Sequence, residues 1–177
     1  MLDATLPADW RDGKLYQTLV DWESGPEAQR LQETYTFPPG AEFRRSALAG
    51  PFVPLRTATD YTAPIASVPA AGSVRVDGWL RRGAGYLVSW PPAPTAATDC
   101  LVAEGEVSAG HVTVGLVRDN HWVAQVPISA NGPFRVVIQA PEAGSYGVVI
   151  ASNGRGLVHD RVTVHRIGWI HVDESAQ

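Results

Sequence analysis

The chain has 177 residues, of which 45% are hydrophobic and 18% charged, and its formal net charge is −4. This length fits one main hydrophobic core with room for an extension, and the composition is that of an ordinary globular protein. The slightly acidic balance creates no basic field, so nucleic acids and anionic membranes are disfavoured as partners. Cys100 is the only cysteine, which excludes an internal disulfide and a cysteine-rich zinc site.

Targeting signals are missing from the sequence as written. No apolar run reaches membrane-spanning length, and the opening "MLDATLPADWRDGK" lacks the basic and then apolar order of a signal peptide. A single cysteine also fits a reducing compartment. The sequence as written therefore predicts a cytoplasmic protein, and it predicts no location if the chain is part of a longer protein.

Residues 1–36 are predicted to form a short helical extension. Asp12 is a suitable N-cap for a helix with Leu19 on its apolar stripe, and a Gly-Pro pair separates it from a second pattern containing Leu31 and Tyr35. Two short helices are expected there.

Residues 37–71 are rich in proline, alanine and glycine and show no sustained period. The segment is expected to lie extended over the main domain. Its anchors would be Phe43, Phe52, Leu55 and Tyr61.

Residues 72–177 change to short runs rich in valine and isoleucine, separated by Gly, Pro, Asn and Asp. With no helical pattern between them, these runs predict an all-β fold, an antiparallel β-sandwich or jelly roll of about eight strands. A parallel sheet would need crossover helices. The predicted strands are "SVRVDGWL", "GYLVSW", "CLVAEGEVS", "HVTVGLVR", "WVAQVPIS", "FRVVIQA", "SYGVVIAS" and "DRVTVHRIGWIHV". The last run changes phase near Arg166 and Gly168, which predicts a bulge and leaves the side of Trp169 open.

The fourth and fifth runs predict a hairpin. A two-residue turn at 119–120 would place the two apolar sets on opposite faces, the wrong register for one core. A three-residue loop at 119–121 pairs Leu116 with Ala124 and Val114 with Val126. We therefore expect the three-residue loop.

Trp122 then points into the core at the edge of the sandwich, opposite Arg118, as most tryptophans are largely buried. The alternative is that Trp122, with His121 and Asn120, meets a ligand at this edge.

Trp79 stands among charged residues. In "SVRVDGWLRR" the apolar residues share one face of the strand, while Arg75, Asp77, Trp79 and Arg81 share the other. An indole suits the apolar face of a pyranose ring, and Asp and Arg can hydrogen-bond its hydroxyls. The alternative is that residues 37–71 or the N-terminal helices cover Trp79.

Glu104 and Glu106 lie two residues apart on a predicted strand, so both carboxylates would face the same way, as a glycosidase pair would. A solvated sheet face shows the same spacing. The five histidines have no recognisable metal-site spacing, so no metal and no cofactor are expected. GxSxG, Walker A and GxGxxG patterns are absent.

The order "GEVSAGHVTVGLVRDNHWVAQVPI", "GPFRVVIQAPEAGSYGVVIAS" and "DRVTVHRIGWI" resembles the accessory jelly-roll modules, galactose-binding-like in the broad sense, of carbohydrate-active proteins. The resemblance covers about residues 72–172 and implies a β-sandwich with a glycan partner. It carries no binding residue across, and the fold hosts many functions.

Three functional hypotheses follow. The leading one is a non-catalytic carbohydrate-binding module that meets its glycan at Trp79 or near Trp122. The second is a structural or oligomerisation domain whose aromatic face contacts a neighbouring domain or a second copy. The third is a glycoside-processing enzyme that uses Glu104 and Glu106.

Overall fold

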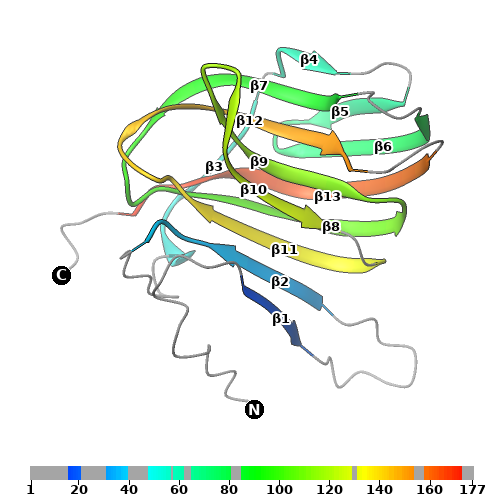
Figure 1. Cartoon of the computed structure of the whole chain (residues 1–177), viewed down its shortest axis with the longest axis horizontal. Coiled ribbons are helices and arrows are strands. Elements are labelled where there is room, and N and C mark those ends of the chain that lie inside the picture. The colour runs from blue at the N-terminus through cyan, green and yellow to red at the C-terminus, as the bar shows by residue number, and fades with distance from the viewer. Residues whose placement is uncertain are drawn as a thin grey trace.

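The structure is a computed structural model of the whole chain (Figure 1). It describes residues 16–20, 31–39, 48–56, 58–61, 65–80, 85–128, 131–153 and 158–172. These ranges contain strands and connecting turns and no α-helix. No helix with the length and apolar character needed to span a bilayer is found among them.

The strands of the described ranges follow one another closely from residue 65 onward. Their bounds are β1 Tyr16–Val20, β2 Leu31–Thr36, β3 Phe52–Pro54, β4 Asp60–Tyr61, β5 Ala66–Ala70, β6 Ser73–Leu80, β7 Tyr86–Thr95, β8 Cys100–Ala109, β9 Val112–Arg118, β10 His121–Ile128, β11 Gly132–Gln139, β12 Gly144–Ser152 and β13 Val158–Ile170.

The strands form two sheets that pack face to face (Figure 1). The eight-stranded sheet has the order β1-β2-β11-β8-β13-β6-β5, with β3 paired to β13 beside this path, and the five-stranded sheet has the order β10-β9-β12-β7-β4. Strands β2 and β11 pair in parallel, while the other pairs in the described ranges are antiparallel. The predicted all-β sandwich is confirmed, and each of the eight predicted runs forms a strand.

The main core lies between the sheets because the apolar residues of each strand recur at every second position. Leu116 and Val114 of β9, Val162 and Val164 of β13, and Trp169 belong to this core. Trp169 reaches the core because the register of β13 shifts between Val164 and Arg166. The bulge predicted in this strand is therefore present, and it puts Trp169 on the inner side.

The two predicted N-terminal helices are wrong where the structure describes that region. Leu19 lies in β1, and Leu31 and Tyr35 lie in β2. In windows of five or six residues, helical and alternating patterns fit equally well, and here pairing with a distant strand, β11, decides between them. The cap at Asp12 and the rest of these helices lie outside the described residues.

Segment 37–71 contributes β3, β4 and β5 to the edges of the sheets. Phe52 packs in a second apolar cluster and Leu55 packs against the main core. Phe43 lies outside the described residues. Tyr61 is in β4, but its side chain is not described.

The second apolar cluster lies on the outer face of the eight-stranded sheet. We call this region the covered end. The strands supply Tyr35, Cys100, Val102, Val137 and Ile170, and these are covered by Phe37, Leu48 and Phe52. At the opposite end of β13, near its first residues, the same outer face carries Trp79. We call the surface formed by Arg75, Asp77, Trp79, His159 and Arg161 the open end.

Candidate functional site

Trp79 stands on the outer face of β6 and is 64% exposed. Val74 and Val76 of the same strand are buried in the main core, so alternation sends Arg75, Asp77 and Trp79 outward. Arg81, the last member of the predicted row, lies outside the described residues. The described part of segment 37–71 leaves the indole exposed.

His159 of β13 stacks on the Trp79 indole. The two residues are direct cross-strand partners, their ring centroids are 5.0 Å apart, and their planes differ by 14°. Cross-strand aromatic pairs of this kind stabilise a sheet and restrict the side chains that form them. The indole is therefore held in place by a neighbour while most of its surface meets solvent.

Asp77 holds His159 in turn. The Nε2 atom of His159 lies 2.9 Å from Oδ1 of Asp77, and the Nε atom of Arg161 lies 3.3 Å from Oδ2. The hydrogen bond from His159 and the charge of Arg161 hold the pKa of the Asp77 carboxyl below its ordinary value of 3.8, against a smaller opposing effect of burial. Asp77 therefore stays an acceptor that positions both side chains.

The open end combines an apolar surface with hydrogen-bond donors. An exposed indole supplies an apolar surface, and the exposed side chains of Arg75 and Arg161 supply donors. The sequence pattern identified the residues on β6. It did not identify His159 and Arg161, because they join the site only through the pairing of β6 with β13.

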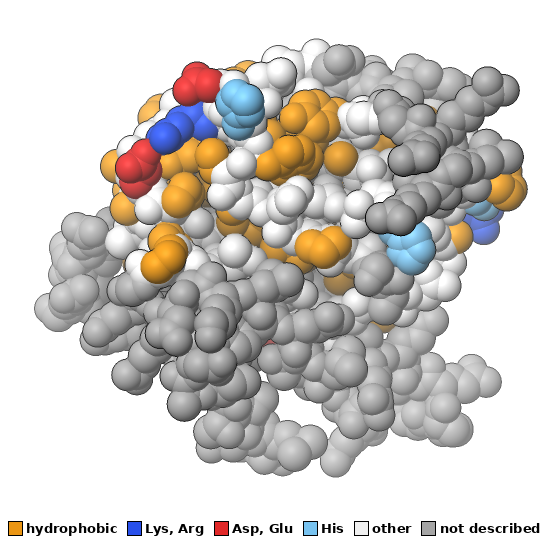
Figure 2. Space-filling model, viewed as in Figure 1, with side chains coloured by type: hydrophobic (Ala, Val, Ile, Leu, Met, Phe, Trp, Pro, Cys, Tyr) orange, Lys and Arg blue, Asp and Glu red, His pale blue; other side chains and the backbone are white. Residues whose placement is uncertain are grey.

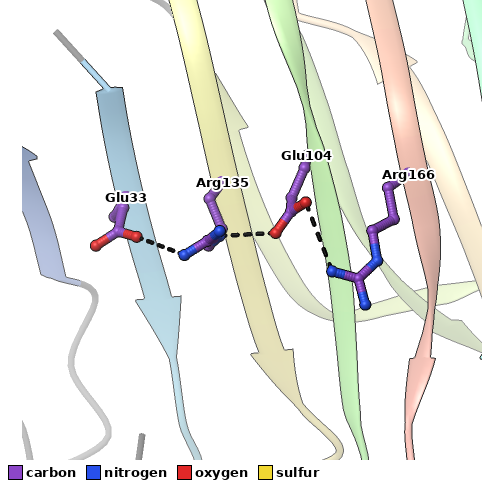
Figure 3. A network of polar contacts seen from close by, with 4 residues as sticks. All are labelled: Glu33, Glu104, Arg135 and Arg166. Carbon is purple, nitrogen blue, oxygen red and sulfur yellow. Dashed lines mark hydrogen bonds and ion pairs between the residues drawn. The ribbon is translucent and has the colours of Figure 1, made fainter. Parts of the chain in front are cut away.

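Glu104 lies in a chain of charged side chains that crosses four strands (Figure 3). Its Oε1 accepts a hydrogen bond of 2.8 Å from Nε of Arg135, and its Oε2 lies 3.7 Å from Nη1 of Arg166. Arg135 also donates to the buried carboxylate of Glu33, at 3.0 Å. Burial lowers the pKa of Arg135, but the charge and hydrogen bond of Glu104, together with the charges of Glu33 and Tyr35, more than offset this and raise it. Glu104 is thus one member of a structural network.

Glu106 shares the outer face with Glu104 but has other surroundings. It is exposed, and its cross-strand neighbours are Thr163 and Pro133. The two carboxylates therefore differ sharply in their contacts, one bound by two guanidinium groups and the other facing solvent.

The hairpin of β9 and β10 differs from the expectation in its turn. Asp119 and Asn120 both have positive φ, 50° and 64°, and form a two-residue turn that pairs Arg118 with His121. A register shift between Trp122 and Ala124 then restores the predicted pairing of Leu116 with Ala124. The predicted three-residue loop is wrong, because a bulge corrects the register instead.

The bulge also overturns the prediction that Trp122 points inward opposite Arg118. Trp122 pairs with Val117, which faces outward because Leu116 is in the core. A Cβ on Gly115 would lie 2.8 Å from Cζ3 of Trp122, so the indole lies against the bare backbone of β9. Its ring meets Tyr86 edge-on, with centroids 5.6 Å apart. Trp122 therefore covers the outer face of the five-stranded sheet.

This outer face is largely uncharged. Figure 2 shows hydrophobic side chains near the middle of the displayed face and charged groups toward its edge. Arg118, the last residue of β9, forms an ion pair of 2.6 Å with Glu142. Asn120 and His121 are exposed at the turn. Trp122, Asn120 and His121 thus belong to one sheet and Trp79 to the other, so they do not form one site.

The histidines are dispersed. His159 contacts Asp77, and Nδ1 of His171 lies 3.0 Å from Oδ2 of Asp99. In the described ranges no group of three or more His, Cys, Asp or Glu side chains is placed to hold a metal ion.

Comparison of the chain with protein-family models, with curated proteins and with solved structures finds no match. The likeness to galactose-binding-like modules therefore remains a resemblance between sequences.

Proposed function

We propose that this chain is a non-catalytic carbohydrate-binding domain that meets its glycan at the open end. The observation that carries the proposal is the Trp79 indole, which is 64% exposed and held by its stack on His159. An indole that is held in place and bordered by hydrogen-bonding side chains is suited to stacking on a sugar ring.

The surroundings of Trp79 support a sugar as the ligand. A pyranose ring can stack on the free surface of the indole while Arg75, Asp77 and Arg161 exchange hydrogen bonds with its hydroxyls. All of these side chains stand on paired strands, so little order has to be gained on binding.

The enzyme hypothesis has less support. Both oxygens of Glu104 contact guanidinium groups, which leaves Glu106 without a free carboxylate partner for acid and base catalysis. We therefore assign binding and no hydrolysis to this face.

In the structural hypothesis, residues 37–71, a neighbouring domain or a second copy cover Trp79. The described part of segment 37–71 packs on the covered end, through Phe37, Leu48 and Phe52, and leaves Trp79 exposed. The charged groups around Trp79 favour a polar ligand over a protein interface, whose centre is usually depleted of charge.

A glycan array tests the proposal. The wild-type chain is compared with Trp79→Ala and with Trp122→Ala, a matched variant on the other sheet, and thermal unfolding confirms that each is folded. We expect binding by the wild type and by Trp122→Ala, and its loss in Trp79→Ala. Binding that survives Trp79→Ala, or an array with no bound glycan, would contradict the proposal.

A further inference from the structure

Positive groups outnumber negative ones at the open end. Asp77 is the single carboxylate among its residues and is shared by His159 and Arg161. Arg75 stands in the same row and is exposed. Within the described part of the chain it forms no ion pair. Among the described residues, no group therefore neutralises all of the positive charge at the open end, on a chain whose net charge is −4.

Arg161 has donors left over. Its Nε faces Oδ2 of Asp77, and its side chain is 55% exposed. The terminal Nη atoms of a guanidinium held in this way are the edge that binds a planar carboxylate through two parallel hydrogen bonds. Asp77 thus orients the guanidinium of Arg161 through its Nε atom and leaves the two Nη atoms to bind a ligand.

The positions of the two arginines suit a chain of sugars. Arg75 and Trp79 are four residues apart on one strand face, about 13 Å along the backbone. Arg161 lies on the adjacent strand, opposite Asp77 and between them. One oligosaccharide can therefore stack on Trp79 and also reach an arginine.

We infer that the glycan bound at the open end is acidic and that Arg161, with Arg75, binds a carboxylate of one of its sugars while Trp79 stacks on a ring. This inference rests on the proposed function and adds the class of glycan. Glu106, a carboxylate on the same outer face, lies in the row of Arg75 but two strands away, beyond Thr163. It is farther from Trp79 than Arg161 is along the face.

The test uses a panel of acidic glycans, each beside its own carboxyl-reduced form. Oligomers of galacturonic and mannuronic acid, hyaluronan oligomers and sialyl-oligosaccharides are titrated into the wild-type chain at low salt. Carboxyl reduction keeps the ring and the linkage and removes only the charge. We expect at least one acidic glycan to bind about tenfold more tightly than its reduced form, with a difference that shrinks as salt is added.

Two variants connect the effect to the open end. Arg161→Gln is expected to lower the affinity for the acidic form about tenfold and the affinity for the reduced form by much less, because only the acidic form loses a charge-assisted contact. Arg118→Gln removes the same charge at the β9–β10 turn, on the other sheet, and is expected to change neither affinity. Thermal unfolding establishes that both variants are folded.

The outcomes separate the two proposals. Equal binding of acidic and reduced forms would overturn the acidic ligand and leave a carbohydrate site in place. If Arg118→Gln lowers the preference for acidic glycans as much as Arg161→Gln does, the preference comes from the net charge of the chain. That result would also overturn the inferred acidic ligand. If no glycan binds in either form, the proposed function fails, and the inference with it.

Discussion

The two ends of the outer face of the eight-stranded sheet differ, although strand β13 runs through both. At the covered end, Cys100, Val102 and Ile170 lie beneath Phe37 and Phe52. At the open end, Trp79 is exposed beside charged groups. Part of the chain thus covers the apolar surface at the covered end, whereas the tryptophan at the open end stays exposed.

A border of charges separates the two ends. Glu33, Arg135, Glu104 and Arg166 cross the sheet in a line (Figure 3), and the guanidinium of Arg166 lies 4.0 Å from the centroid of the Phe52 ring. The network contacts the cover on one side and the polar surface on the other. The outer face of this sheet therefore leaves Trp79 exposed at the open end while its apolar side chains at the covered end are buried. This contrast supports a binding role for Trp79.

The largest expected effect concerns Cys100 at the covered end. Burial, with a smaller contribution from the charge of Asp99, raises the pKa of its thiol from 9.0 to about 12. The thiolate fraction at pH 8 is then about a thousandfold lower than in an exposed cysteine. We expect a thiol reagent to label the folded chain at least that much more slowly than the unfolded chain. Fast labelling of the folded chain would mean that the covered end is open.

A substitution at Gly168 tests how tightly β3 packs beside β13 at the covered end. A Cβ there would lie 2.3 Å from the carbonyl oxygen of Val53 and 2.7 Å from Cζ of Phe52, so Gly168→Ala is expected to lower the free energy of unfolding by about 3 kcal/mol. Urea unfolding measures the change. Arg75→Ala, at the exposed and unpaired position of the open end, is the control and should alter it by less than about 0.5 kcal/mol. Equal changes in the free energy of unfolding would contradict the difference in packing between the covered end and the open end.

Arg135→Met tests the border. The substitution keeps much of the volume but removes the donors to Glu33, which is buried, and to Glu104. Loss of one partner of a buried carboxylate should cost about 2 kcal/mol of unfolding free energy. A Glu33→Gln, Arg135→Met double variant should recover part of this loss, because no buried charge is left behind. A neutral Arg135→Met would show that the network contributes nothing to stability.

Trp79→Ala should have a smaller effect on stability, below about 1 kcal/mol, since the indole is 64% exposed and loses mainly its stack on His159. Unfolding in urea checks this value. A loss as large as that for Gly168→Ala would mean that Trp79 is packed in solution.

The smallest expected effect is in the titration of Asp77. Its pKa is lowered in the folded chain, so its contribution to stability is present above about pH 3.8 and is lost as the pH falls through the folded pKa. Carbon-detected NMR should find the pKa below 3.8 in the wild type and closer to that value in His159→Gln. An unchanged pKa in the variant would contradict the hydrogen bond that positions His159.

The sequence was sufficient for most of the fold. The eight runs after residue 72 alternate clearly and end at turn residues, so each was recognisable as a strand. Strands β1 and β2 were missed because they are short and gain their structure from pairing, with β2 joining β11 about a hundred residues away. Such a distant partner leaves no signal in a local pattern.

The candidate site was only partly predictable. Alternation along β6 placed Asp77 and Trp79 on one face, but the partners of these residues come from β13 and depend on which strands pair. Trp122 was assigned to the wrong side because a single bulge reverses the phase of alternation. Bulges and strand neighbours are tertiary features.

The most direct test of a ligand-binding open end is an NMR titration of the ¹⁵N-labelled indole groups with the panel of acidic and carboxyl-reduced glycans. If the open end binds a glycan, the Nε1–H signal of Trp79 shifts in a saturable way while the signals of Trp122 and the buried Trp169 stay in place. A Trp79 signal that none of the glycans moves, or a response confined to Trp122, would contradict glycan binding at the open end.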